Sequence, residues 1–187
     1  MRDIYQLYAK HHPTFTADDI YNLSKELDTV IYFEALSEVS VRVSHDLFIS
    51  KEMIPFDTDA VDRAINSFLS KDYIRIREID SFLIFPNVGY EWNEYLLESF
   101  LLSYSKKFAL VNNGLSLNNV AGFVVKKSGQ INDFIDACAA FLADGRIELK
   151  KVDALNYLAD MNVISRRGYK DIDLALRRAA QIRRRKE

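Results

Sequence analysis

The sequence predicts an α+β fold in which helices predominate. Two amphipathic segments begin with helix-capping residues, several short runs are typical of strands, and one segment is apolar around most of a helical wheel. The 187 residues are 49% hydrophobic, enough to bury a sizeable core as one domain or as two small ones. Twelve Phe and ten Tyr against six Gly and three Pro exclude a disordered or low-complexity chain.

The first capped helix is expected at residues 17–27. Thr16 precedes it and Asp19 follows three residues later, as in a capping motif. The apolar residues that recur at helical spacing are Ile20, Leu23 and Leu27. Beyond this helix, residues 30–36 are apolar and expected to be helical. Residues 39–43 alternate valine with polar side chains, as on a half-buried strand.

A second capped helix is expected after Asp57, and a β-hairpin after that helix. The apolar face of the helix is formed by Val61, Ile65, Phe68 and Leu69. Residues 70–72 interrupt the pattern. Two apolar runs follow at residues 73–79 and 82–85 and are closed by Pro86, so we expect them to pair as a hairpin.

This order of elements, short helices followed by a longer helix and a two-stranded hairpin, resembles the winged-helix architecture over residues 15–86. The resemblance implies a third helix in the DNA major groove and a hairpin wing that touches the DNA backbone. The chain departs from that pattern because the expected third helix carries three acids against Arg63 and Lys71, which would repel phosphates. Arg75 and Arg77 share the polar face of the expected wing strand. We therefore expect a structural or protein-binding winged helix more than a DNA reader.

Residues 89–107 are expected to form a helix that is buried on nearly every side, because apolar side chains surround its wheel. Glu98 lies within it. This acid is expected either to emerge at the helix edge or pair with a Lys or Arg, or to act as a general base with a perturbed pKa. Residues 112–114, Asn-Asn-Gly, predict a hairpin turn between the apolar runs 108–111 and 115–117.

The second half of the chain resembles the first when the sequence is shifted by 73 positions. The shift places the helix-to-strand junction after Phe68 opposite a similar junction after Phe141. This similarity predicts two winged-helix-like units joined by the buried central helix. The expected division is a unit at residues 1–88, the connecting helix at 89–107 and a helical unit with a basic terminal helix at 108–187.

Candidate catalytic groups are few. Glu148 and Lys150 have the Glu-x-Lys spacing of metal-dependent nucleases, a minor alternative, but a solvated strand face with a Glu-Lys pair explains the same pattern. The three histidines lack the further ligands that a metal site needs, and Cys138 lies in an apolar stripe where a thiol is inert. Neither a GxxxxGK[ST] nor a GxGxxG phosphate-binding motif is present. We expect a protein that is not an enzyme, with no catalytic residues, cofactor or metal.

Charge is segregated at the carboxyl end of the chain. Residues 166–187 hold nine Lys or Arg and three acids, a net +6, so the other 165 residues carry −8 in a chain of net charge −2. A helix from Ile172 is expected to dock through an apolar face made of Ile172, Ala175, Leu176, Ala179 and Ile182. The opposite face, made of Arg177, Arg178, Gln181, Arg184 and Arg185, is left for an anionic partner.

The expected function is non-catalytic binding of nucleic acid, as a regulator or the DNA-contacting part of a larger system. The expected contact residues are Arg166, Arg167, Tyr169, Lys170, Arg177, Arg178, Arg184, Arg185, Arg75 and Arg77, with the Tyr169 ring able to stack on a base or a sugar. The alternative is a protein-interaction adaptor whose acidic winged-helix-like surfaces dock other subunits. Basic residues in a last helical turn also stabilise the helix dipole by themselves.

A membrane is not an expected partner. No apolar stretch approaches the roughly 18 residues of a membrane span, and the amino terminus lacks the apolar region of a secretory signal. The apolar face of the terminal helix is mostly Ala and Ile without Trp or Phe, too thin to insert into a lipid surface. We expect a cytoplasmic protein.

Overall fold

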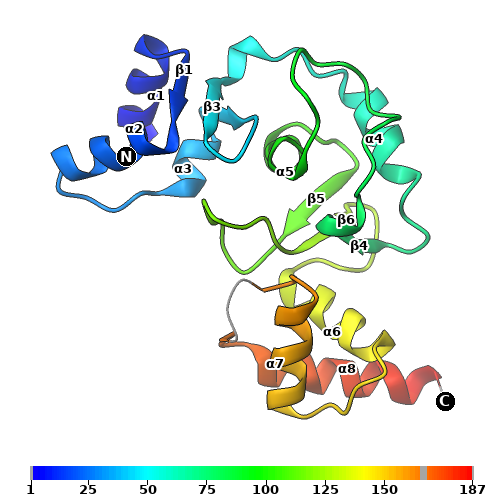
Figure 1. Ribbon diagram of the computed structural model, residues 1–187. Helices are drawn as coiled ribbons and strands as arrows, with labels where there is room; N and C mark the ends of the chain where they lie inside the picture. The colour runs from blue at the N-terminus through cyan, green and yellow to red at the C-terminus, as the bar shows by residue number, and fades with distance from the viewer. Residues whose placement is uncertain (1, 165–167, 187) are drawn as a thin grey trace. The chain divides into compact units, whose positions relative to one another are not determined.

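The computed structural model describes residues 2–164 and 168–186 (Figure 1). Eight α-helices and two three-stranded antiparallel sheets make up the described chain, which confirms the predicted α+β class with helices predominant. The chain divides into two compact units. Unit 1 contains the residues up to Asn66 together with Asp80–Lys106 and Leu115–Val120, and unit 2 contains Ser67–Ile79, Lys107–Gly114 and the residues from Ala121 onward.

Unit 1 begins with helices and a small sheet. In chain order its first elements are α1 (Arg2–His11), β1 (Thr14–Thr16), α2 (Ala17–Glu26), α3 (Phe33–Ser37), β2 (Ser40–Arg42) and β3 (Leu47–Ser50). The sheet has the order β1-β3-β2, and β2 and β3 are neighbours in an antiparallel hairpin. Phe15 on β1 lies opposite Phe48 on β3, and the two rings stack in the core beneath the helices.

The start of α2 confirms the capping motif predicted from the sequence. The Thr16 hydroxyl accepts a hydrogen bond from the Asp19 amide at 3.2 Å, and the Asp19 carboxylate accepts one from the Thr16 amide at 2.7 Å. This reciprocal pair satisfies two backbone donors that the first helical turn would otherwise leave free. The next helix is shorter than expected, because α3 begins only at Phe33.

The strand predicted at residues 39–43 forms as β2, but it is not half-buried. Ser40, Val41 and Arg42 are all buried. The expected polar face is covered because the Ser99 side chain, from a helix later in unit 1, accepts a hydrogen bond from the Arg42 amide at 2.9 Å. The alternating pattern therefore predicted the strand correctly, but the prediction that one of its faces is exposed was wrong.

The remaining elements of unit 1 are the 3₁₀ turn η1 (Lys51–Met53), α4 (Thr58–Asn66) and α5 (Glu94–Ser103). Helix α4 confirms the second capped helix, although it ends before Phe68. Asp62 is fully buried within α4, where its carboxylate accepts hydrogen bonds from the Ser105 hydroxyl and the Lys106 amide. The Asp62 side chain is thus a structural hydrogen-bond acceptor. A helix that enters a DNA groove would instead expose its polar side chains, and Asp62 is not exposed.

Helix α5 confirms that a helix lies within residues 89–107, although it is shorter than predicted at both ends. The Asn93 side chain caps it by accepting from the Tyr95 and Leu96 amides at 2.9 and 3.1 Å. Its consecutive residues from Leu96 to Leu101 are all buried. A helix buried on so many sides lies inside the core of unit 1.

Unit 2 contains the second sheet, made of β4 (Tyr73–Arg75), β5 (Phe108–Val111) and β6 (Phe123–Lys126) in the order β4-β6-β5. The hairpin predicted at residues 73–85 was wrong. Strand β4 pairs with β6, the chain continues as the 3₁₀ turn η2 (Ile76–Glu78), and residues 82–85 form no strand. The two sheets share one strand order, since in each the last strand along the chain lies between the other two.

The hairpin predicted around residues 112–114 was also wrong in its second strand. Strand β5 pairs with β6, so the return strand begins at Phe123 and not at Leu115. Gly122 just before it has a φ of +119°, and a Cβ atom there would lie 2.5 Å from the Val111 carbonyl oxygen. Only glycine permits the chain to enter β6 this close to the end of β5.

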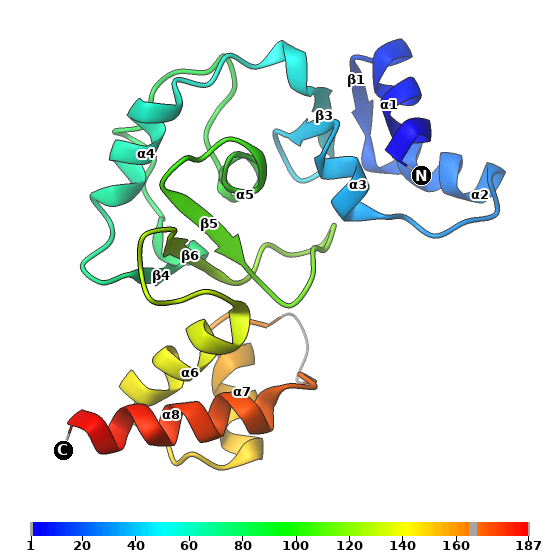
Figure 2. The same cartoon turned by 180° about the vertical axis from the view of Figure 1, so that it is seen from behind.

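Three helices complete unit 2: α6 (Phe134–Asp144), α7 (Lys151–Asp160) and α8 (Ile172–Lys186). Helix α8 packs against α6 and α7, as both views show (Figure 1, Figure 2). Cys138 is fully buried in α6, where burial raises the pKa of its thiol. Residues 147–149 form no strand, so the helix-to-strand junction predicted there by the 73-residue shift is wrong.

Candidate nucleic-acid interface

Helix α8 docks on unit 2 by the apolar face that its sequence predicts. Ile172, Ala175 and Ala179 are buried, and Leu176 and Ile182 pack against the same core. The partner surface is mainly α6, which contributes Cys138, Leu142 and their apolar neighbours. Because this docking fixes the rotation of α8 about its axis, it also decides which of its cations face protein and which face solvent.

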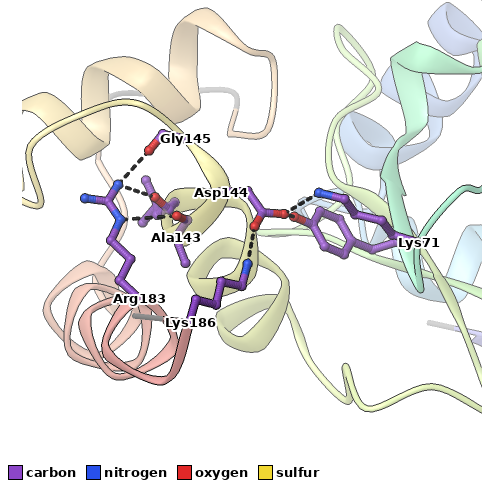
Figure 3. A network of polar contacts seen from close by, with 8 residues as sticks. Lys71, Ala143, Asp144, Gly145, Arg183 and Lys186 are labelled. Atoms are coloured by element: carbon purple, nitrogen blue, oxygen red, sulfur yellow. Dashed lines mark hydrogen bonds and ion pairs between the residues drawn. The ribbon is translucent and has the colours of Figure 1, made fainter.

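Arg183 faces protein. Its guanidinium donates hydrogen bonds to four backbone carbonyl oxygens, those of Leu142, Ala143, Gly145 and Ile147, at 2.9, 3.2, 2.6 and 3.0 Å. Figure 3 shows the bonds to Ala143 and Gly145. These carbonyls belong to the carboxyl end of α6 and the turn after it, where a helix leaves its last acceptors without internal donors. Arg183 therefore acts as a side-chain cap on α6.

Arg183 was not predicted to lie on either face of α8. A usable pattern was present, since Arg183 follows Leu176 by seven residues and Ala179 by four, which places it within the apolar stripe. A long basic side chain in such a stripe buries its stem and carries its charge to polar groups at the edge of the core.

Lys186, in the last turn of α8, also faces protein. Its ammonium lies 2.6 Å from one oxygen of Asp144, and the other oxygen accepts hydrogen bonds from the Lys71 ammonium at 2.6 Å and the Tyr73 hydroxyl at 2.8 Å (Figure 3). Burial raises the pKa of Asp144, but the hydrogen bonds from Lys186, Lys71 and Tyr73 outweigh it and lower the pKa to about 2. This cluster ties the end of α8 to α6 and β4.

The sequence placed Arg178 on the basic face of α8, but two acids at the amino-terminal end of α6 contact its guanidinium. Its guanidinium is 2.5 Å from the Asp136 carboxylate and 3.8 Å from that of Asp133, and 36% of the side chain is exposed. Both acids belong to the amino-terminal end of α6. Arg178 is therefore engaged within unit 2.

Three arginines of α8 remain free for a partner. Arg177, Arg184 and Arg185 are exposed, and none has a hydrogen bond or ion pair with the residues that the structure describes. Gln181, also exposed, lies between them on the same face. Arg177 and Arg184 are seven residues apart, about 10 Å along the helix axis. We call Arg177, Arg184 and Arg185 the arginine stripe.

The other predicted contact residues of the carboxyl-terminal region differ in their exposure. Lys170 is exposed, whereas Arg166 and Arg167 lie outside the described residues. Tyr169 is only 6% exposed, and its ring contacts Phe134 edge-on at 5.3 Å between centroids. The prediction that this ring stacks on a base or a sugar is therefore wrong in this structure, because the ring belongs to the core.

Arg75 and Arg77 do not share a strand face, because β4 ends at Arg75 and Arg77 lies in η2. Arg75 donates to the Glu78 carboxylate at 3.0 Å and to the Met161 carbonyl at 3.1 Å. Among the predicted residues, the structure thus brings together only the arginine stripe on one solvent-facing surface of the described chain.

The groups weighed for catalysis do not assemble into a site. Glu148 and Lys150 form an ion pair at 2.5 Å on an irregular segment, with both side chains at least 70% exposed. His45 lies 2.5 Å from Asp46, and both are exposed. Within residues 2–164 and 168–186, no three His, Cys, Asp or Glu side chains gather as metal ligands.

Glu98 is the one candidate acid that the structure buries. It is 5% exposed and lines a cavity of about 30 Å³ together with Arg42 and Ser99. It does not emerge at the helix edge, and no described residue donates a hydrogen bond to it or forms an ion pair with it. Burial raises the pKa of Glu98, and the nearby Arg42 charge offsets only part of this rise. The pKa is about 7.

Comparison with known proteins finds no relative. No protein family matches the chain, and searches of curated proteins and of solved structures return no match. None of the helices that the structure describes has both the length and the apolar character needed to cross a membrane.

Proposed function

We propose that this protein binds nucleic acid through the arginine stripe of α8. The observation that carries the proposal is the division of the helix cations. Arg178, Arg183 and Lys186 are engaged within unit 2, whereas Arg177, Arg184 and Arg185 project from a docked helix without a described partner. Guanidinium groups suit phosphates because their planar donors match two phosphate oxygens at once.

The strength of such binding follows from counterion release. Each phosphate neutralised by a cation contributes about 0.9 to the slope of the logarithm of affinity against the logarithm of salt concentration on a duplex. Three arginines predict a slope of about −3, with Lys170 able to add one contact more. The proposed binding is therefore weak at physiological salt and independent of base sequence where only phosphates are contacted.

The test replaces Arg177, Arg184 and Arg185 by alanine in the full chain and measures anisotropy of labelled oligonucleotides over a range of salt concentrations. The matched control replaces three exposed cations of unit 1, Lys10, Lys25 and Arg63, and so changes the net charge by the same amount. We expect the stripe variant to lose about tenfold or more in affinity and nearly all of the salt slope.

The control variant is expected to keep both the affinity and the slope. Equal losses in the two triple variants would show that net charge alone attracts the oligonucleotide, and the proposal would be wrong. The absence of salt-dependent binding in the unaltered protein would also overturn it.

We propose a second role for residues 2–50, a winged-helix-type module that binds protein. Support comes from the short helices α1, α2 and α3 followed by the β2–β3 hairpin, although the five-residue α3 stands where the resemblance expects a longer helix. The module carries four Lys or Arg against eight acids, so it repels phosphates. Leu7 and Val30 are 60% and 64% exposed, as apolar contacts of a protein partner need to be.

This second role is tested by replacing Leu7 and Val30 with serine and quantifying the proteins that co-purify with the full chain. The control is Leu83→Ser, because Leu83 is 94% exposed and lies outside the module. We expect at least one protein that co-purifies with the unaltered chain and with Leu83→Ser but not with the Leu7 and Val30 variant. Oligonucleotide binding is expected to be the same in all three. Identical sets of co-purified proteins for both variants would contradict the role.

A further inference from the structure

Unit 2 has a hollow lined by aromatic rings beside the carboxyl end of α6. It measures about 440 Å³, and its lining includes Phe68, Lys71, Tyr73, Phe141, Asp144 and Tyr157. We call it the aromatic hollow. Each of the four rings belongs to a residue that is partly exposed. The volume falls within the range of pockets that bind small molecules in other proteins.

The aromatic hollow borders the end of α8 that carries two arginines of the stripe. Asp144 and Gly145 line the hollow, and both are contacted from α8, Asp144 by Lys186 at 2.6 Å and the Gly145 carbonyl by Arg183 at 2.6 Å. Arg184 and Arg185 lie between these two α8 residues in the chain and are exposed. Arg184 and Arg185 therefore belong to the same last turn of α8 as the two residues that contact the rim of the hollow.

The rings are held in place before any ligand arrives. Tyr157 stacks on Phe141 with centroids 5.2 Å apart and planes 16° from parallel. Gly145 packs so closely that a Cβ atom there would lie 3.1 Å from the Tyr157 ring. Tyr73 is fixed by its hydrogen bond to Asp144 at 2.8 Å. Fixed rings lose little freedom when another flat ring stacks on them, so less of the binding free energy is spent on ordering.

The chemistry of the hollow selects a flat, uncharged ring. Its walls are aromatic, and its polar groups include both the Lys71 ammonium and the carboxylates of Glu78 and Asp144, so a phosphate gains little there. A nucleobase offers both donors and acceptors on its edge and a π-face for stacking. Bases within a duplex are stacked on each other, whereas those of a single strand are free to enter.

We infer that the aromatic hollow takes a base of single-stranded nucleic acid whose phosphates contact the arginine stripe. This inference rests on the proposed function and names its substrate as single-stranded. The arginine stripe supplies attraction to the backbone, and the hollow supplies stacking, the two components of single-strand recognition. Preference for a single strand over a duplex is its measurable consequence.

The experiment compares three ligands by anisotropy with the full chain: a thymidine oligonucleotide, an abasic deoxyribose-phosphate strand of the same length, and a duplex. We expect the base-bearing strand to bind about fivefold to a hundredfold more tightly than the abasic strand, the range that stacking of one base provides. Tyr157→Leu is expected to remove that difference while leaving the abasic affinity unchanged. Tyr21→Leu, at an exposed tyrosine of α2, is the control.

Phe68→Leu serves as a second variant if Tyr157→Leu fails to fold, which thermal melting would reveal, and it is expected to give the same result. Equal affinities of the unaltered protein for the base-bearing and abasic strands would overturn the inference and leave the proposed function intact. Tighter binding of the duplex than of the single strand would also overturn it. Binding of none of the three ligands would overturn the proposed function as well.

Discussion

Glu98 in unit 1 and Asp144 in unit 2 are both helix carboxylates, and their surroundings shift their pKa values in opposite directions. Glu98 is 5% exposed, and no described residue donates a hydrogen bond to it, so burial raises its pKa to about 7. Burial also raises the pKa of Asp144, but three donors lower it to about 2. Loss of water thus destabilises a carboxylate only where the protein provides no donors in return.

In each unit, an arginine side chain donates hydrogen bonds to several backbone carbonyl oxygens. Arg42 in unit 1 donates to the carbonyls of His45, Ser116 and Leu117, and Arg183 in unit 2 donates to carbonyls at the end of α6. Each links segments that lie apart in the sequence. A count of cations therefore does not measure the positive charge offered to a partner, because some of these cations stabilise the fold instead.

The largest expected effect separates two neighbouring arginines of α8. Arg183→Ala leaves the carbonyls at the end of α6 without their donor, and we expect the free energy of unfolding to fall by about 3 kcal/mol. Arg184→Ala removes an exposed side chain without a described partner, and we expect a change within about 0.5 kcal/mol. Urea denaturation followed by far-UV circular dichroism measures both values.

Alanine is the matched replacement because it favours helix equally at both positions. Oligonucleotide anisotropy on the same two proteins sharpens the comparison, since only Arg184 belongs to the arginine stripe. Equal losses of stability in the two variants would show that Arg183 does not cap α6. They would also contradict the distinction between α8 cations that stabilise unit 2 and those that are free to bind a partner.

The second effect concerns the pH dependence of unit 1. The pKa of Glu98 is raised from its ordinary 4.5 to about 7, so the folded protein holds a proton there that the unfolded chain releases. The contribution of Glu98 to stability is therefore greatest at acidic pH and falls as the pH rises from about 4.5 to 7. The expected loss by pH 7 is about 3 kcal/mol, since each pKa unit corresponds to about 1.4 kcal/mol.

Glu98→Gln keeps a neutral side chain of the same size and is expected to remove this slope and to stabilise the protein above pH 7. Fluorescence of Trp92, the single tryptophan, reports unfolding of unit 1 in urea. Arg42 is the cation and Glu94 the other acid whose charges act on Glu98. If the variant and the unaltered protein lose stability in parallel between pH 4.5 and 7, another group is responsible.

The elements that the sequence predicted correctly depend on short-range information. The start of α2 follows from a capping pair three residues apart, and the burial of α5 follows from apolar residues around one helix. Strand β4 was assigned the wrong partner because its true partner, β6, lies about 50 residues further along the chain. Local turn rules cannot identify a pairing over that separation, and strands of three or four residues carry little pattern of their own.

The candidate interface could also be predicted only where local sequence patterns determine it. Helical periodicity placed Arg177, Arg184 and Arg185 opposite the docking face, and the structure agrees. It could not reveal that Arg178 meets Asp136, because that acid lies 42 residues earlier in the sequence. The aromatic hollow was not predicted for a related reason, since Phe68, Phe141 and Tyr157 come from three separate segments.

The smallest expected effect tests the other side of the comparison. Asp144 has a folded pKa of about 2, below its ordinary 3.8, so it contributes stability above pH 4 that is lost as the pH falls from about 4 to 2. Asp144→Asn removes the negative charge that Lys71 and Lys186 contact. We expect the free energy of unfolding at neutral pH to fall by about 1 kcal/mol. The expected fall is small because both lysine side chains are more than half exposed, so water screens their charges. Hydrogen exchange of the α6 amides against pH measures the change within unit 2. The stability lost on acidification should be smaller in the variant than in the unaltered protein. Stability due to Asp144 rises with pH, whereas stability due to Glu98 falls with pH. If the variant loses as much stability in acid as the unaltered protein, the donors around Asp144 do not stabilise its charge.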